Sequence, residues 1–130
     1  MIVVDASALL EVLLRTPAAT AVESRLFAAG ETLHAPHLLD VEVAQVLRRY
    51  VALGQIDAAR AREALDDLAD FPFRRYPHDL LLPRIWDLRH NLTAYDAAYV
   101  ALAEALDAAL ITRDERLAGA PGHRARVEVI

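Results

Sequence analysis

The fold follows from two short apolar stretches, Ile2-Val3-Val4-Asp5 near the start of the chain and Ala109-Leu110-Ile111-Thr112 near its end. Each has the length and the aliphatic character of a strand buried on both faces. Each leads into a polar residue and a pattern typical of a helix start. Buried strands that alternate with helices predict a parallel sheet covered by helices on both faces.

The rest of the chain predicts the remaining elements of an α/β domain. Further strands are expected at residues 32–35, 73–76 and 126–130, with the last at a sheet edge. Helices are expected at residues 6–14, 17–29, 38–53, 57–70, 77–90 and 93–107, with one helical turn at 114–117. Thr16-Pro17 and Asp57 favour helix starts, and Gly30 and Gly54 favour helix ends. Without a visible linker or repeat, residues 1–130 are expected to form a single three-layer α/β/α domain.

The composition excludes several kinds of site. The chain has no cysteine, so disulfides and thiolate metal sites are impossible, and its five histidines show no HExxH spacing. No signal peptide or membrane span is visible, so a soluble cytoplasmic protein is expected. All 14 basic residues are arginine, and the net charge of −5 argues against a generally nucleic-acid-coating surface. Arginine still permits local bidentate phosphate contacts, although genomic base composition explains the bias equally well.

Four acidic residues in separate stretches are the best functional candidates: Asp5, Glu42, Asp96 and Asp114. Asp5 and Asp114 follow the two buried strands, and Asp96 opens a helix. Side chains outside the carboxyl ends of parallel strands meet at one edge of the sheet. Carboxylates gathered there repel one another unless a hard divalent cation lies between them. A Mg²⁺ or Mn²⁺ site is therefore expected, with simple helix capping as the alternative for each aspartate.

Glu42 differs from the other acids because it lies inside a helix. Apolar residues fill most of the helix circumference over the first three turns, and Glu42 shares a narrow polar stripe with Gln45 and Arg49. A solvated stripe is the simpler alternative. A narrow polar stripe on a mostly buried helix favours the lining of a cleft, so Glu42 is expected to join the acidic site.

The four acids stand in motifs that resemble those of PIN domains. Asp5-x-Ser7 resembles the opening motif, and Glu42-x-x-x-Val46-Leu47 resembles the second acidic motif. Thr93-x-Tyr95-Asp96-Ala97-x-Tyr99 resembles the third motif, and Thr112-x-Asp114-x-x-Leu117 resembles the fourth. The motifs occur in order over nearly the whole chain, whose length is similar to that of VapC-type toxins of toxin–antitoxin systems.

The resemblance implies a sheet with strand order 3-2-1-4-5, a homodimer, an RNA substrate and an inhibiting VapB-type antitoxin. Metal-dependent ribonuclease activity is implied as well, with one or two Mg²⁺ ions held by Asp5, Asp96 and Asp114. Glu42 would bind a metal-bound water or the second ion, and water attack would leave a 5′-phosphate. Two departures from the family pattern are Gln45, where many relatives have asparagine, and Arg116, where some carry another acid.

Residues close to the acids in sequence are expected to support them. Ser7 and Thr112 are placed to hydrogen-bond a neighbouring carboxylate and orient it, with helix or loop capping as the alternative. Arg113 and Arg116 flank Asp114 and are expected to face an RNA phosphate or an acidic antitoxin segment. Plain solvent exposure is the alternative for both arginines.

Other functions were weighed against the nuclease. Response-regulator receiver domains and haloacid-dehalogenase-type phosphatases also place acids at strand ends, but both would be expected to use a lysine, and this chain has none. A PIN-like module that binds RNA or protein without cutting stays open as an alternative. The apolar content of 55% further predicts a two-fold homodimer and a separate groove for an amphipathic antitoxin helix.

Overall fold

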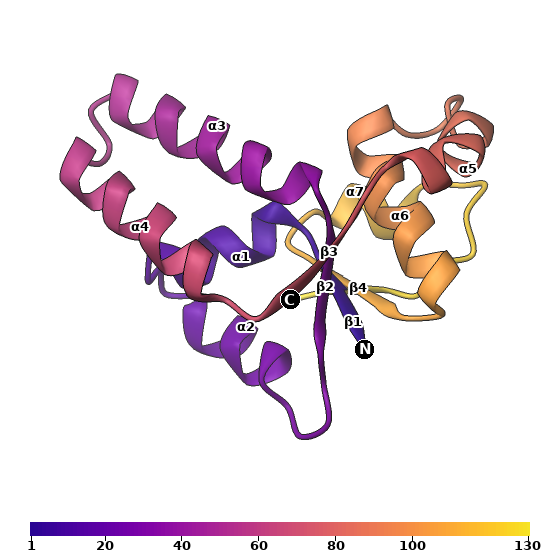
Figure 1. Ribbon diagram of the computed structural model, residues 1–130, viewed down its shortest axis with the longest axis horizontal. Helices are drawn as coiled ribbons and strands as arrows, with labels where there is room; N and C mark the ends of the chain where they lie inside the picture. The colour runs from indigo at the N-terminus through magenta and orange to yellow at the C-terminus, as the bar shows by residue number, and fades with distance from the viewer.

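A five-stranded parallel sheet forms the centre of the protein in the computed structural model, which describes residues 1–130 (Figure 1). Its strands lie in the order β3-β2-β1-β4-β5. They are β1 (Ile2–Val4), β2 (Leu33–Pro36), β3 (Phe73–Tyr76), β4 (Ala109–Thr112) and β5 (Val127–Val129). Every pairing is parallel. The expected α/β class, the strand positions and the strand order are confirmed.

The two stretches that decide the fold are neighbours at the middle of the sheet. Ile2 of β1 lies opposite Ala109 of β4, and Val4 lies opposite Ile111. Every residue of both strands is buried, which suits strands covered by helices on each face. Because the two strands run in the same direction, the residues that follow them leave the sheet at the same edge.

Helices form an outer layer on each face of the sheet (Figure 1). The first face carries α1 (Ala6–Leu13), α2 (Ala19–Leu26), α3 (Leu38–Ala52) and α4 (Ala58–Asp70). The second carries α5 (Leu82–Asp87) and α6 (Ala94–Leu106), and α7 (Glu115–Gly119) packs against β5. The predicted three-layer α/β/α arrangement is therefore confirmed.

Four helix starts are capped by side chains that the sequence indicated. The Asp5 carboxylate accepts the Ala8 N–H at the start of α1, and Asp57 caps α4 in the same way. The Thr93 hydroxyl accepts the Asp96 N–H in the first turn of α6. These bonds satisfy N–H groups that have no partner inside the helix. Asp114 caps α7 by accepting the Arg116 N–H. Three candidate site residues, Asp5, Asp96 and Asp114, therefore also take part in helix capping.

The helix predicted at 17–29 is shorter than expected. It begins at Ala19, and Thr16 does not cap it, because the Thr16 hydroxyl donates a hydrogen bond to Glu11 instead. It ends at Leu26, so Gly30 lies in the turn beyond the helix and does not end it. The Glu11 carboxylate therefore holds the Thr16 side chain that the sequence predicted to cap the helix.

The helix predicted at 77–90 is also shorter. A 3₁₀ turn (Asp79–Leu81) leads into the six-residue α5. Pro83 lies in the first turn of α5 and has no N–H to donate to the carbonyl four residues earlier. The proline therefore starts a new helix rather than continuing the preceding turn.

The helix α3 is less buried than its sequence predicted. Only Leu39, Val43 and Leu47 are fully buried along it, and Val41 is 67% exposed. Figure 1 shows α3 and α4 as a hairpin that extends away from the sheet. The expectation of a mostly buried helix was wrong, because α3 fully buries only one stripe, which packs against α4, α1 and β2, and its other apolar residues are half-buried or exposed.

The helix α6 has a long buried segment. All its residues from Ala97 to Ala103 are buried, and it packs on β1, β2 and β4. These packing contacts hold the first turn of α6 beside the carboxyl ends of the central strands. No helix, α6 included, combines the length and apolar character that a membrane span requires.

Candidate active site

Asp5 lies where β1 passes into α1 and is 7% exposed. Its Oδ1 accepts hydrogen bonds from the Ser7 hydroxyl at 2.6 Å and the Ala8 N–H at 3.1 Å. Its Oδ2 accepts a short hydrogen bond from the Thr112 hydroxyl at the end of β4. Burial raises the pKa of Asp5, these hydrogen bonds oppose the rise, and the charge of Asp96 adds to it. Asp5 is thus a buried carboxylate held in one orientation.

Ser7 and Thr112 link the segments that carry Asp5 and Asp114. The Ser7 hydroxyl also accepts the Arg113 N–H at 2.9 Å, and the Thr112 hydroxyl accepts the Asp114 N–H at 3.0 Å. The two hydroxyl oxygens are 3.3 Å apart. Through these bonds the end of β1 and the end of β4 hold each other in place, so the positions of two acids are coupled.

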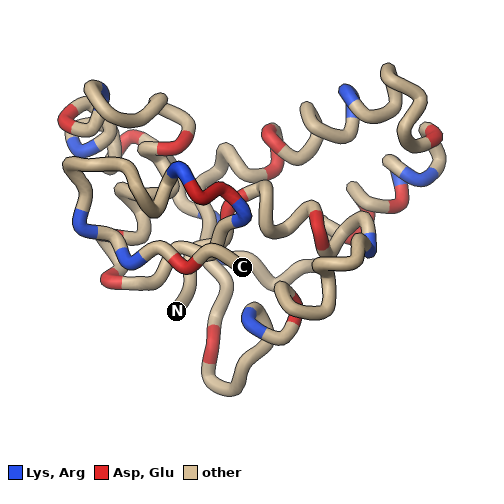
Figure 2. Tube along the Cα trace, turned by 180° about the vertical axis from the view of Figure 1, so that it is seen from behind, with Lys and Arg blue, Asp and Glu red and all other residues tan.

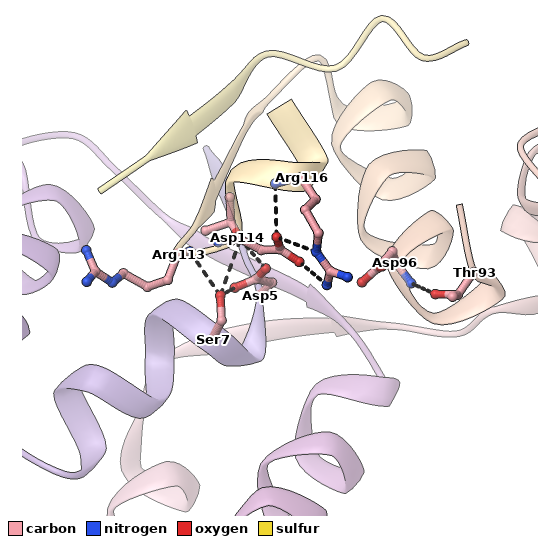
Figure 3. Close-up of polar contacts among 8 residues, drawn as sticks. Asp5, Ser7, Thr93, Asp96, Arg113, Asp114 and Arg116 are labelled. Carbon is pink, nitrogen blue, oxygen red and sulfur yellow. Dashed lines mark hydrogen bonds and ion pairs between the residues drawn. The ribbon is translucent and has the colours of Figure 1, made fainter. Parts of the chain in front are cut away.

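Asp114 is paired with Arg116, two residues further along the chain. The guanidinium donates to both carboxylate oxygens of Asp114, at 3.0 and 2.7 Å. This contact holds the pKa of Asp114 below its usual range. In Figure 3 the guanidinium lies between the carboxylates of Asp114 and Asp96. Arg116 therefore meets acids of its own chain, a contact that the sequence did not indicate.

Arg113, the other arginine beside Asp114, points away from the acids (Figure 3). Its guanidinium lies 3.6 Å from Glu11 and also reaches the carbonyl of Ile130. The two arginines expected to act alike are therefore not equivalent. Arg116 neutralises part of the acidic site, and Arg113 lies outside it.

Asp96 approaches the site from the first turn of α6. Burial raises its pKa most, the charge of Asp114 raises it further, and Thr93 and Arg116 lower it. In Figure 3 the Asp96 carboxylate is directed toward the Arg116 guanidinium. Because the charge of Asp96 acts on Asp5 and that of Asp114 acts on Asp96, the three aspartates share one site.

Glu42 reaches the same site from α3. Burial raises its pKa, the Tyr99 hydroxyl lowers it, and the charges of Asp5 and Asp96 raise it further. Its Oε1 is buried and has no hydrogen-bond partner of good geometry. All four acids that the sequence singled out therefore come together, although α3 itself is largely exposed.

Tyr99 is the residue of this site that sequence reasoning did not single out. It lies three residues after Asp96 in the third motif, a spacing that places two side chains on one face of a helix. That spacing was the available signal. Tyr99 is 2% exposed, and its hydroxyl is buried without a hydrogen-bond partner. Burial raises the pKa of Tyr99, and the charges of Glu42 and Asp5 raise it further.

The acids supply only oxygen ligands, which suit a hard cation such as Mg²⁺ or Mn²⁺. Burial raises the pKa of Asp5, Glu42 and Asp96, and the charge of another acid of the site raises each of them further. As the side chains stand, no three of them are close enough to hold one metal ion, and Asp114 is occupied by Arg116. The donor chemistry fits a divalent cation, and Arg116 is the group that such a cation would displace.

Two surface hollows flank Glu42. One, of about 380 Å³, is lined by Ser7, Glu42 and Arg113 among others. The other, of about 360 Å³, includes Gln45 and Tyr95. A larger hollow of about 410 Å³ lies between α1, α2 and α4, but none of the four acids lines it. Of the four acids, only Glu42 lines these two hollows, and the three aspartates line neither.

Acidic and basic positions are interspersed along the chain trace (Figure 2). With a net charge of −5, any contact with phosphate would depend on individual arginines beside the acids.

The fold and the site define a class of protein, a parallel α/β domain whose carboxylates gather at the carboxyl ends of its strands. The sequence profile of the PIN domain matches residues 2–122. This chain therefore belongs to the PIN-domain family, and the resemblance drawn from its motifs is confirmed.

Several proteins named as ribonucleases are similar to this chain over most of its length. VapC ribonuclease Mb0985 of Mycobacterium bovis is 50% identical over 117 residues, which covers 90% of this chain and 88% of that protein. Ribonuclease VapC1 of Mycobacterium tuberculosis is 46% identical over 129 residues, which covers 98% of this chain and 96% of that protein. The expected likeness to VapC proteins is confirmed.

Solved structures show the same fold. PAE2754 of Pyrobaculum aerophilum matches with a TM-score of 0.70 at 29% identity, over 98% of this chain and 82% of that chain. VapBC2 of Rickettsia felis, bound to a DNA fragment from its promoter, matches with a TM-score of 0.74 at 14% identity, over 99% of this chain and 98% of that chain. At 14% identity, the second match shows a shared fold and nothing more.

Proposed function

We propose that this chain is a metal-dependent endoribonuclease that hydrolyses RNA phosphodiester bonds and acts as the toxin of a type II toxin–antitoxin pair. The observation that carries the proposal is the convergence of Asp5, Glu42, Asp96 and Asp114 at one edge of the sheet. The close likeness to proteins named VapC ribonucleases supports the same activity.

Three aspartates are the proposed metal ligands: Asp5, Asp96 and Asp114. A bound Mg²⁺ or Mn²⁺ ion would neutralise charge at the phosphate and lower the pKa of the attacking water. Asp5 is already oriented for this by the hydroxyls of Ser7 and Thr112. Arg116, once released from Asp114, would contact an RNA phosphate at the mouth of the site.

Glu42 is proposed to accept a hydrogen bond from the attacking water and to orient it. Its Oε1 has no hydrogen-bond partner, so this oxygen is free to accept a hydrogen bond from the water. Burial raises the pKa of Glu42, which makes it a better base than an exposed glutamate. The RNA strand would pass over the two hollows beside Glu42, and Arg49 lines both of them.

A VapB-type antitoxin is the proposed protein partner. Between α3 and α4 lies an apolar hollow of about 340 Å³, lined by Leu47, Val51 and Leu65 among others. A hollow of this kind accepts the apolar face of an amphipathic helix. Arg48 and Arg62 belong to the same lining, which favours a helix with acidic residues beside its apolar face. We place the pair in the cytoplasm on the same basis as the toxin assignment.

Cleavage of a defined RNA by the purified protein tests the proposal. We expect cleavage with Mg²⁺ or Mn²⁺ and none in EDTA. Asp5→Asn and Asp114→Asn should abolish it, whereas Asp66→Asn, on the exposed face of α4, should cut at the wild-type rate. Binding of RNA by the wild type without cleavage under any divalent cation would instead support the alternative, an inactive PIN-like binding module.

A further inference from the structure

The hollow of about 360 Å³ beside Glu42 follows one face of α3. Its lining residues on that helix are three or four positions apart, so they form one stripe: Leu38, Val41, Glu42, Gln45, Val46 and Arg49. Tyr95, from the first turn of α6, completes the lining, and it shares a second hollow with Leu38. This hollow therefore brings an aromatic ring of α6 and polar side chains of α3 together beside one of the four acids.

Tyr95 presents an exposed ring next to the acidic site. The residue is 63% exposed and directly precedes Asp96, in a turn that the Thr93 hydroxyl caps. Single exposed aromatic side chains are common, and Phe27 is another. Phe27 lines the hollow between α1, α2 and α4, which contains none of the four acids, whereas the hollow at Tyr95 contains Glu42. The position of Tyr95, rather than its exposure, sets it apart.

Arg49 lacks the carboxylate partner that the other arginines near the site have. Arg113 pairs with Glu11, and Arg116 pairs with Asp114. The Arg49 guanidinium pairs with no carboxylate and lies 5.7 Å from the centre of the Tyr50 ring. Its N–H donors therefore remain available for a phosphate. Arg49 lies two helical turns after Glu42, about 10 Å along the axis, so this phosphate would not be the one at the acids.

The chemistry of the hollow fits a single-stranded nucleic acid. Aromatic side chains stack on unpaired bases, and guanidinium groups bind the phosphates that join them. Gln45 is exposed on the same stripe, and its amide can both donate to and accept from the edge of a base. A base is uncharged, so it can lie on Tyr95 beside Asp96 without the repulsion that a phosphate would meet there.

We propose that Tyr95 is a specificity-determining residue that stacks on one unpaired base next to the cleaved bond, while Arg49 binds a phosphate further along the same strand. A base inside a duplex is already stacked on its neighbours and cannot offer its face to the ring. Tyr95 therefore selects RNA in which a base is free to leave its stack. The proposal rests on RNA as the substrate of the proposed function, but the contact can be measured without cleavage.

Fluorescence anisotropy of a labelled, single-stranded oligouridylate in EDTA measures the contact. We expect Tyr95→Ala to weaken binding about tenfold, the size of effect that loss of one base–aromatic stacking contact produces. Tyr95→Phe keeps the ring and should bind like the wild type. Phe27→Ala, at an exposed aromatic residue away from the acids, is the matched control and should also bind like the wild type. The affinity for double-stranded RNA should be the same in Tyr95→Ala and wild type.

A fluorescent base reports the stacking itself. The emission of 2-aminopurine is quenched when this base stacks, so it is placed at each position of the oligouridylate in turn. We expect quenching at one position on binding to the wild type and to Tyr95→Phe, and none at that position with Tyr95→Ala. Arg49→Gln should retain the quenching and reduce the salt dependence of binding by about one phosphate contact.

Three results would overturn the proposal: no binding of the oligouridylate by the wild type, equal binding by Tyr95→Ala and wild type, or an equal loss for single-stranded and double-stranded RNA. Equal binding would leave the hollow to a protein partner. A protein that binds through Tyr95 but cuts no RNA with any divalent cation would retain the contact and refute the ribonuclease. A ribonuclease whose Tyr95→Ala variant binds and cuts like the wild type would retain the activity and refute the contact.

Discussion

Each acid of the site is stabilised by different neighbours. Asp5 accepts three hydrogen bonds, and Asp114 is neutralised by Arg116. Asp96 and Glu42 lack compensation of that strength, and burial raises the pKa of both. Removal of charge should therefore have a different effect on stability at each position, although every removal should abolish catalysis.

Asp96→Asn should stabilise the metal-free protein while abolishing cleavage. The folded state raises the pKa of Asp96, so the folded protein holds this proton more tightly than the unfolded chain does. The tighter proton binding stabilises the folded wild-type protein fully at pH values below the pKa that Asp96 has in the unfolded chain. This stabilisation is lost as the pH rises through the pKa of Asp96 in the folded protein. At pH 7 we expect a gain on the order of 1 kcal/mol, or a few degrees in melting temperature.

Urea unfolding in EDTA at several pH values measures this effect. The gain in Asp96→Asn over wild type should shrink as the pH falls through the raised pKa, and Asp66→Asn should show no such dependence. A gain that does not change with pH would mean that repulsion and burial of the Asp96 charge are not its cause.

Arg116→Gln should strengthen binding of Mn²⁺ in the absence of RNA. The guanidinium competes with a metal ion for Asp114, and its removal lets the pKa of Asp114 return toward the ordinary value. Since the arginine side chain is 87% exposed, we expect only a two- to fivefold gain, about the strength of an exposed ion pair. Calorimetric titration with Mn²⁺ provides the measurement. Arg113→Gln, whose guanidinium pairs with Glu11, is the control and should leave affinity unchanged.

At the level of the elements, the junction of β1 and β4 determines the geometry of the site. Adjacent parallel strands place Asp5 and Asp114 at one edge, and the Thr112 hydroxyl bonds to both segments. The first turn of α6 adds Asp96, and α3 adds Glu42. The site is thus assembled at the point where the two central strands and helices from both faces meet.

Thr112→Val should weaken this junction by about 2 kcal/mol, because it leaves a carboxylate oxygen of Asp5 and the N–H of Asp114 without their partner. The substitution changes the side-chain volume little, so lost packing adds little to the effect. Urea unfolding gives the stability, and Thr112→Ser, which keeps the hydroxyl, should recover most of it. A Thr112→Val protein as stable as wild type would show that these two hydrogen bonds are not needed.

For the molecule as a whole, we predict that apolar surface on the 3₁₀ turn and α5 packs against a second copy of the chain. Leu80, Leu82 and Trp86 are 83%, 55% and 67% exposed. The expected two-fold homodimer would bury such side chains, since clustered apolar exposure is a common mark of an interface.

The fluorescence of Trp86, the only tryptophan, reports on this surface. On dilution we expect the emission to shift to the red as the dimer dissociates, with light scattering showing the matching loss of mass. Trp86→Ala should shift the equilibrium toward the monomer. A protein that scatters as a monomer at tens of micromolar, with no antitoxin present, would exclude the homodimer.

Local patterns in the sequence were sufficient for much of this fold. The runs Ile2-Val3-Val4 and Ala109-Leu110-Ile111 predicted the central strands, because only a strand covered on both faces is apolar at every position. The order of strands and helices then predicted the layers, and the four acids predicted where chemistry would lie. Each of these inferences depends on neighbouring residues or on a general rule of chain connection.

Contacts between distant segments were decided by the tertiary structure alone. The hydrogen bonds from Thr112 to Asp5 and from the Arg113 N–H to Ser7 depend on how strands and helices lie against one another in space. The pairing of Arg116 with Asp114 depends on which way a side chain turns. The shortened helix at Ala19 and the exposed α3 have the same origin, since a capping signal or an apolar stripe shows what a residue favours, whereas the atoms packed around it decide which partner it meets.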